Sequence, residues 1–518
     1  MESSEQTSTN GETANQDQVK VRLSIRQFCL AGCCKYLCDD FSILAQFAPD
    51  SITDPPVLSK RLGLRDLVFA QILAVVGNTW VGTAAPLGKA QALTWIAAMV
   101  LFYLPLGAVV IYLNRQTPLE GGIYQWAKGA FGDAAGFMVA WNVWFYAVIY
   151  IASILFALPT ELGYMLGPAA AWLPQSRIAS IGLLIAVLAC ITVLTVRGLQ
   201  VGKWIHNGGS LALLGVYVIL ILLPFWAWHR SGSVEWTALT LQLPQRTAFN
   251  MALFGQMLFG ALSGLEYIAI LAGESKSPAK TIGRSVILAS PIICTMFILG
   301  TASVVTFVGH GTVDFIAPIP QTLRLAFGSH GIGNLLAESA IFLLEIRLLG
   351  ISSFLFTGVT RLPLTAGWDH LLPAWFTKLH PRWRTPTNSI LFASGLILLL
   401  LLLGSAGVRS QETFQVLINA SSAHYSLAYM VMFAIPIIGI RGVRRALPPW
   451  LKWTSLIGLG ATLFSFGISA YPFVDVVNPL GYAAKVLGAT AISNAVGYGL
   501  YAARQRRPVS PVEQNALG

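Results

Sequence analysis

Three ionisable residues lie near the middle of apolar runs that are long enough to cross a membrane. Glu266 ends the stretch FGALSGLE, while Glu345 and Arg347 stand together in FLLEIRLLG. A charged side chain at mid-membrane costs at least about 2.5–3.5 kcal/mol on insertion scales, so each one is a functional candidate. For Glu266 the chemistry to expect is proton uptake and release, or shaping of the charge of a substrate site.

The spacing of these charges constrains how they pair. Residues two apart on a helix point about 200° away from each other, so Glu345 and Arg347 are not expected to form a simple pair. Each then needs a partner on another helix, and Glu266 is a candidate partner for Arg347. Glu338 precedes Glu345 by one heptad, on roughly the same face. The alternative is a structural ion-pair network that only fixes helix packing.

The composition is that of a membrane protein. Of the 518 residues, 55% are hydrophobic and 11% are charged, and the mean hydropathy is +0.66. Soluble domains carry about 25% charged residues. Because apolar runs of about 20 residues recur along the chain, we predict an all-α integral membrane protein. No metal-ligand spacing, nucleophile elbow or phosphate loop is found, so neither an enzyme nor a metal nor a cofactor is expected.

We predict twelve transmembrane spans from these apolar runs. They are Leu64–Thr83, Ala92–Leu113, Ala135–Leu158, Ile178–Val196, Ile205–Trp228, Phe249–Leu271, Ile282–Val308, Leu335–Phe356, Ile390–Leu403, Phe414–Ile438, Trp453–Ala470 and Gly481–Tyr501.

The distribution of basic residues predicts the orientation. Of the 33 Lys and Arg residues, 25 fall on the side of the N-terminus, six on the other side and two within spans. This bias is the positive-inside pattern, which places both termini in the cytoplasm and the protein in the cytoplasmic (inner) membrane. The net charge of +11 therefore reflects topology, and no nucleic-acid partner is expected.

Residues 1–60 are predicted to form a cytoplasmic tail, disordered at first and without a signal peptide. The tail carries the cluster CLAGCCKYLC, with Cys29, Cys33, Cys34 and Cys38. This spacing fits no common zinc pattern, and a short amphipathic helix on the inner leaflet is the plainest interpretation. Metal binding or lipid attachment is the alternative. Residues 504–518 form the second predicted cytoplasmic tail.

Two of the predicted spans contain residues that weaken helices. The first holds AVVGNTWVGTAAPLG, and the sixth holds FGQMLFGALSGLEYIAILAGE. Small residues often serve only close helix packing. Two weakened helices five spans apart instead predict an inverted repeat of five spans plus five, with unwound backbone around a polar site for a zwitterion such as an amino acid. The predicted substrate-binding residues are Gly77, Asn78, Thr79, Trp80, Val81, Gly82, Thr83, Phe259, Gly260, Ala261, Leu262, Ser263 and Gly264.

Four motifs in order carry a family resemblance that runs from about residue 64 to the end. They are GNTWVGTAAPLG in the first span, PLEGGIYQWAKGAFGDAAGF after the second, GLEYIAILAGESKSPAKTIGRSV at the sixth and TRLPLTAGWDHLLPAWFTKLHPRWRTPTNSI after the eighth. The chain resembles the amino acid–polyamine–organocation (APC) superfamily of permeases. Within it, the chain is most similar to the glutamate/GABA and agmatine/arginine exchangers.

The resemblance implies a LeuT-like fold. Ten core helices would occupy residues 61–440, with inverted repeats at about 64–228 and 249–438, and two extra helices would occupy 441–503. It implies a substrate site between spans 1, 3, 6, 8 and 10, and transport of an amino acid or amine by exchange or proton symport. The chain would be a monomer or homodimer in membrane lipid. Sodium symport, with Ser352 and Ser353, and a transporter-like sensor are the alternatives.

Departures from the family pattern affect the expected site. Where the family often has Gly-Ser-Gly, this chain has Val81, Gly82 and Thr83, with the bulk of Trp80 beside them. Gly260, next to Phe259, takes the place of an aromatic gate. The fifth span lacks the lysine of some proton-coupled relatives. Further residues that either face the pathway or only pack are Asn142, Trp144, Tyr146, Ser421, Ser422 and Tyr425.

Overall fold

A computed structural model describes residues 62–116, 121–231, 239–270, 275, 277–309, 311–365, 374–406, 410–439 and 448–505. These residues all belong to one compact unit, Leu58–Arg506. The N-terminal tail with its four clustered cysteines lies outside the described residues, and so does the C-terminal tail from residue 506.

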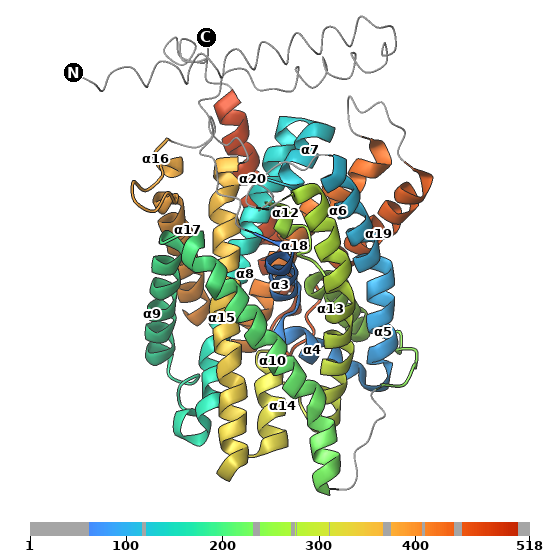
Figure 1. Cartoon of the computed structure of the whole chain (residues 1–518), viewed down its shortest axis with the longest axis vertical. Coiled ribbons are helices and arrows are strands. Elements are labelled where there is room, and N and C mark those ends of the chain that lie inside the picture. Colours follow the sequence, from blue (N-terminus) through green and yellow to red (C-terminus); the bar gives the residue numbers. More distant parts are fainter. Residues whose placement is uncertain are drawn as a thin grey trace, which may run out of the picture. The chain divides into compact units, whose positions relative to one another are not determined.

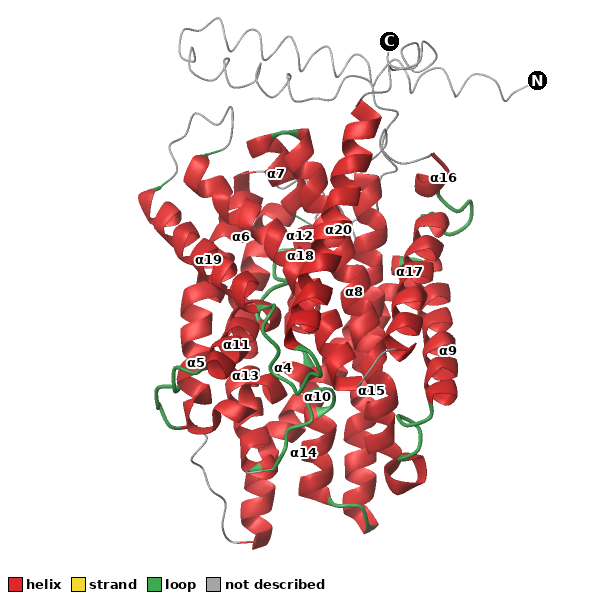
Figure 2. Ribbon diagram, turned by 180° about the vertical axis from the view of Figure 1, so that it is seen from behind, coloured by secondary structure: helices red, strands yellow, loops and turns green. Residues whose placement is uncertain are grey.

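The described part of the chain is built from helices, and no strand occurs in it (Figures 1 and 2). Its longer helices are α3 (Leu64–Val75), α5 (Gln91–Ala98), α6 (Leu104–Gln116), α7 (Ile123–Phe131), α8 (Asp133–Leu166), α9 (Arg177–Val196), α10 (Leu199–Ser231), α11 (Ala248–Gly255), α13 (Pro278–Val308), α14 (Pro318–Phe327), α15 (Gly331–Thr365), α17 (Thr387–Ala406), α18 (Ser410–Ile438), α19 (Pro449–Ile468) and α20 (Pro479–Gln505). Its shorter ones are α4 (Asn78–Ala84), α12 (Tyr267–Ile270) and α16 (Ala374–Thr377), with 3-10 turns η1 (Ala85–Ala90) and η3 (Gly167–Ala170) and π-helical turns η2 (Met99–Tyr103) and η5 (Gln256–Ala261).

Nine helical stretches of the described chain are long and apolar enough to cross a membrane. They cover nine of the predicted spans and confirm a multi-pass helical membrane protein. The predicted first and sixth spans are absent from the nine because each is divided into shorter helices. The predicted twelfth span is the helix α20, which carries Lys485, Ser493 and Asn494 and is less apolar.

The divided helices lie inside the bundle. Helix α3 packs against α10, α13 and α15, and Figure 1 shows it surrounded by these longer helices. Helix α8 packs against both α15 and α18, while α9 and α17 pack together at one side. Leu67, Ile72 and Leu73 of α3 are almost fully buried. Burial of α3 within protein allows its backbone to be interrupted, since irregular backbone facing lipid would leave polar groups without partners.

Helix α14 covers α4 from the lower end of the view in Figure 1. A Cβ atom built on Gly82 of α4 would lie 2.4 Å from Cβ of Pro318, so only glycine permits this approach. The contact accounts for Gly82 without any role in ligand binding.

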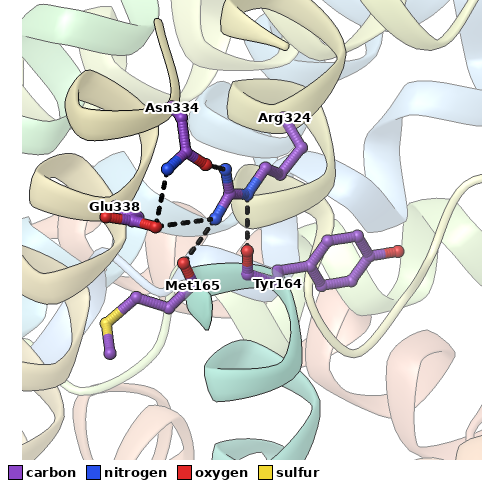
Figure 3. Close-up of polar contacts among 5 residues, drawn as sticks. All are labelled: Tyr164, Met165, Arg324, Asn334 and Glu338. Carbon is purple, nitrogen blue, oxygen red and sulfur yellow. Dashed lines mark hydrogen bonds and ion pairs between the residues drawn. The ribbon is translucent and has the colours of Figure 1, made fainter. Parts of the chain in front are cut away.

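Arg324 fastens α14 to the end of α8 (Figure 3). Its Nε donates to the carbonyl oxygen of Tyr164 over 2.5 Å, and its Nη2 donates to that of Met165. Nη1 donates to Oδ1 of Asn334, and Glu338 lies 3.9 Å from the guanidinium. The last carbonyls of a helix have no partner within it, and a cation stabilises that end. Glu338 therefore belongs to this clamp.

We predict that Arg324→Gln lowers the melting temperature of the purified protein. The substitution leaves two partly buried carbonyls without their donors, which costs roughly 1–3 kcal/mol. The matched control is Arg177→Gln, at an exposed position at the start of α9, and its melting temperature should equal that of the unmodified protein. Equal melting temperatures for both variants would show that the clamp contributes nothing to stability.

Candidate functional site

The first predicted span is interrupted at Val76 and Gly77, which join α3 to α4 in an extended conformation. Each of these residues has a carbonyl outside the helical hydrogen-bond pattern. Nη2 of Arg347 donates to the carbonyl oxygen of Val76 over 3.2 Å, and the hydroxyl of Tyr217 donates to that of Gly77 over 3.0 Å. Side chains of α15 and α10 therefore satisfy the carbonyls that the break frees.

The break is shorter than the sequence suggests. Unwound backbone was expected from Gly77 to Thr83, but Asn78–Ala84 forms the short helix α4. The hydroxyl of Thr83 donates to the carbonyl of Thr79, within the same helix. Helix resumes at once because each unwound residue inside the membrane needs polar partners from elsewhere in the protein.

The sixth predicted span is also interrupted. It begins as α11, widens into the π-helical turn η5, leaves helical structure between Leu262 and Glu266, and ends as α12. Gly264 has a φ of +105°, a conformation that favours glycine, and its amide donates to the hydroxyl of Tyr429 over 2.8 Å. A Cβ on Gly264 would lie 3.6 Å from the carbonyl oxygen of Ala74. The two breaks therefore lie side by side.

Trp80 fills the space between the two interrupted helices. A Cβ on Gly77 would lie 2.7 Å from its indole ring, and one on Gly260 would lie 2.7 Å from its Cη2 atom. The ring is buried and extends from the first break to the sixth span. The bulk of Trp80 and the small size of Gly260 are therefore complementary.

Some of the other predicted substrate residues line this site, and the rest pack against neighbouring helices. Asn78 and Thr79 line a small cavity at the first break. Val81 faces Gly300 of α13, and Gly82 faces α14. The ring of Phe259 packs against aromatic side chains of η2 and α18. The remaining positions of the sixth span are buried in the core; they are Ala261, Leu262 and Ser263.

Glu266 is held by two tyrosines of α18. The hydroxyl of Tyr425 donates to its Oε1 and the hydroxyl of Tyr429 to its Oε2. The ring of Tyr146 from α8 stacks on Tyr425, with centroids 3.7 Å apart. The expected pairing of Glu266 with Arg347 is wrong. Tyrosine hydroxyls satisfy the carboxylate, and the break supplies a carbonyl acceptor for the arginine.

Of the further residues expected either to face the pathway or to pack, Tyr146 and Tyr425 belong to this aromatic group, whereas the others make contacts between helices or within one helix. Asn142 and Asn494 of α20 exchange two amide hydrogen bonds. The ring of Trp144 stacks with two neighbouring aromatic rings. Hydrogen bonds within α18 involve the hydroxyl of Ser421 and the carbonyl of Ser422.

Glu161 is a site residue that the sequence analysis missed. Asn78 donates to its carboxylate, and the side chain is 2% exposed. The third span was predicted to end at Leu158, before Pro159, but α8 continues through this proline to Leu166. An acidic residue within one turn of the end of an apolar run was the available signal.

Glu161, Asn78 and Arg347 line one small cavity, together with Tyr150 and apolar side chains. Its volume of about 10 Å³ accommodates roughly one water molecule. An amino acid does not fit, so a ligand enters only when the surrounding helices move apart. Glu345 lies two residues before Arg347, and both of its carboxyl oxygens are buried without a hydrogen-bond partner in the described part of the chain. Across the same residues, no group of three or more His, Cys, Asp or Glu side chains is arranged to hold a metal.

Comparison with known proteins places these features in context. A family model described as amino acid permease matches residues 62–490. An uncharacterized transporter of Legionella pneumophila is 27% identical over 73% of this chain and 81% of its own length. A probable agmatine/putrescine antiporter of Lactococcus lactis is 23% identical over 71% and 78%, respectively. A serine/threonine exchanger of Bacillus subtilis is 23% identical over 86% and 95%.

We predict that Gly260→Ala destabilises the protein through a clash with Trp80. The new methyl group overpacks a filled space, which typically costs about 1–3 kcal/mol and lowers the melting temperature. Adding Trp80→Phe removes the outer ring atoms and should restore most of the loss. Gly395→Ala in α17 is the matched control, because nothing lies within 4 Å of its added Cβ. A double variant no more stable than Gly260→Ala would contradict this account of the contact.

Proposed function

Because the chain belongs to the amino acid permease family, we propose that it is a secondary active transporter of amino acids or related amines. It works by alternating access, through exchange or coupling to protons. The observation that carries this proposal is the meeting of two interrupted helices inside the bundle, at Val76–Gly77 and at Leu262–Glu266. Interrupted helices of this kind offer main-chain groups for both ends of a zwitterion.

The side chains around the breaks favour a substrate with an ammonium group. Glu266 supplies a negative charge beside the second break, and the rings of Tyr146, Tyr425 and Phe259 surround it. Aromatic faces and carboxylates both attract cations in places shielded from water. We assign the ammonium end of the substrate to Glu266, which exchanges its tyrosine hydrogen bonds for the ligand when the site opens.

The finer architecture is part of the same proposal. We infer a LeuT-like arrangement of twelve spans, with repeats at about 64–228 and 249–438, because the breaks recur five spans apart. The distribution of basic residues supports a location in the cytoplasmic membrane with both termini inside. Two relatives, one named as a probable antiporter and one as an exchanger, support exchange. Sodium symport stays a prediction. Ser353, one of the two serines that it would use, has its hydroxyl 3.3 Å from Nε2 of His206.

Counterflow in proteoliposomes tests the transport function. Vesicles are loaded with unlabelled serine, threonine, arginine, agmatine or putrescine, and uptake of the same labelled compound is measured. We expect at least one compound to enter several-fold faster than into vesicles without protein. Ligand-induced stabilisation of the purified protein without any counterflow would instead indicate a sensor. Repeating the assay with choline in place of sodium tests the sodium alternative.

We predict that Glu266→Gln weakens binding of the transported amine. Loss of one charge-assisted hydrogen bond costs about 1.5–3 kcal/mol, so the half-saturating substrate concentration should rise by roughly tenfold or more. Tyr425→Phe keeps the ring and the carboxylate, and its effect should be smaller. Uptake measured across pH also tests a coupling role for Glu266. Unchanged affinity and unchanged pH dependence in the glutamine variant would remove this residue from the substrate site.

A further inference from the structure

Three buried ionisable groups meet beside the first break. Glu161 of α8 and Arg347 of α15 line the same small cavity and are 2% and 3% exposed. Glu345 lies on α15 close enough to Glu161 for the two carboxyl groups to repel each other. This charge cluster, consisting of Glu161, Glu345 and Arg347, is separate from Glu266, which is bonded to tyrosines of α18.

The charge balance of the cluster requires a proton. With both carboxyl groups ionised, the three side chains together carry a net charge of −1, and Glu345 faces the like charge of Glu161. A buried charge without compensation is strongly disfavoured, so the closed structure is neutral only when one carboxyl group is protonated. The cluster therefore contains a site for one proton.

The hydrogen bonds identify which carboxyl group holds the proton. Glu161 accepts a hydrogen bond from Asn78 and lines the same cavity as Arg347, and both neighbours stabilise its ionised form against the cost of burial. Glu345 has no hydrogen-bond donor on either oxygen among the described residues, and its oxygens are shielded from solvent. The proton therefore belongs on Glu345.

No other described group offers Glu345 a compensating charge. The elements packed against α15 are α3, α8, α9, α10, α12, α14 and α17. Besides Glu161, these elements carry titratable side chains that contact other groups: Asp66 with Asn207, His206 with Ser353, Tyr217 with Gly77, Tyr267 with Leu355, Tyr164 with Asp314, Arg324 in its clamp, Tyr146 and Tyr150 in the aromatic stack, and Asp133 with Lys128. Arg65, Arg177, Cys190 and His229 are the remaining titratable residues of these elements whose side chains the structure describes, and α17 contributes none.

The cluster also holds both sides of the first break. Arg347 donates to the carbonyl of Val76, the last residue before Gly77, and Asn78, the first residue after it, donates to Glu161. If Glu345 loses its proton, its negative charge repels the carboxylate of Glu161, which accepts the hydrogen bond from Asn78. Proton loss at Glu345 thereby weakens the contacts that keep α3 and α4 in their closed arrangement.

We propose that Glu345 is the proton-binding site that couples proton movement to the opening of the first break. One proton adds to the carboxylate in the closed structure and leaves the carboxyl group on opening, so one proton accompanies each transport cycle. This inference rests on the proposed transport function.

The test compares two assays in proteoliposomes, with a substrate that counterflow has identified. One is uptake against a concentration gradient, driven by an imposed pH difference; the other is counterflow at equal pH. For the unmodified protein, we expect the pH difference to drive accumulation. Glu345→Gln, which resembles the protonated form, should lose this accumulation by at least tenfold and lose far less of its counterflow. Glu338→Gln, on the same helix within the Arg324 clamp, is the control and should keep its response to the pH difference.

A second variant tests the proposal if Glu345→Gln does not fold. Glu161→Gln removes the carboxylate through which an ionised Glu345 acts on the Asn78 contact, so the pH difference should again fail to drive accumulation. The melting temperature of each variant reports folding. Full pH-driven accumulation in folded Glu345→Gln protein, or its absence from the unmodified protein while counterflow proceeds, would overturn the proton-site proposal. Absence of all substrate movement in the unmodified protein would instead overturn the proposed transport function.

Discussion

Main-chain polar groups inside a membrane need hydrogen-bond partners from the protein, because lipid tails offer none. This constraint governs the centre of the structure. Where the first span leaves helical geometry, Arg347 and Tyr217 supply donors to the carbonyls of Val76 and Gly77. Where the sixth span does so, Tyr429 accepts from the amide of Gly264. The interruptions exist only because α10, α15 and α18 bring side chains to them, so a movement of these helices directly alters the breaks.

Two buried acidic centres flank the interrupted helices, and their surroundings give them different chemistry. Glu266 has a donor for each oxygen and aromatic rings around it, which suits the recognition of a cation. Glu161 lines the same cavity as Arg347, and Glu345 has no hydrogen-bond partner among the described residues, an arrangement that suits a single proton. Trp80 lies between the interrupted helices and reaches Gly260, so the closed state leaves only a small cavity. Trp80 and Gly260, which each differ from the family pattern, are therefore complementary in size.

Much of the fold could be predicted because hydropathy and helix-breaking residues are local properties. Nine predicted spans correspond to long apolar helices, and the two spans predicted to be weakened in their middle are the two that are interrupted. Prediction failed where distant packing overrides a local signal. The third span was expected to end at Leu158, yet α8 continues through Pro159 to Leu166 and brings Glu161 to Asn78. The unwound segment was expected to reach Thr83, but it ends at Gly77.

The sequence by itself determined that the chain crosses a membrane many times, which spans are interrupted, and which charged residues deserve attention. Each of these follows from residue types within about 20 neighbouring positions. Only the tertiary structure decided which groups pair. Arg347 binds a carbonyl 271 residues away instead of Glu266, and Glu266 binds tyrosines 159 and 163 residues away. The partner of each side chain depends on how the helices pack and on which polar groups lack a hydrogen bond. A local stretch of residues determines neither the packing nor the set of unbonded groups.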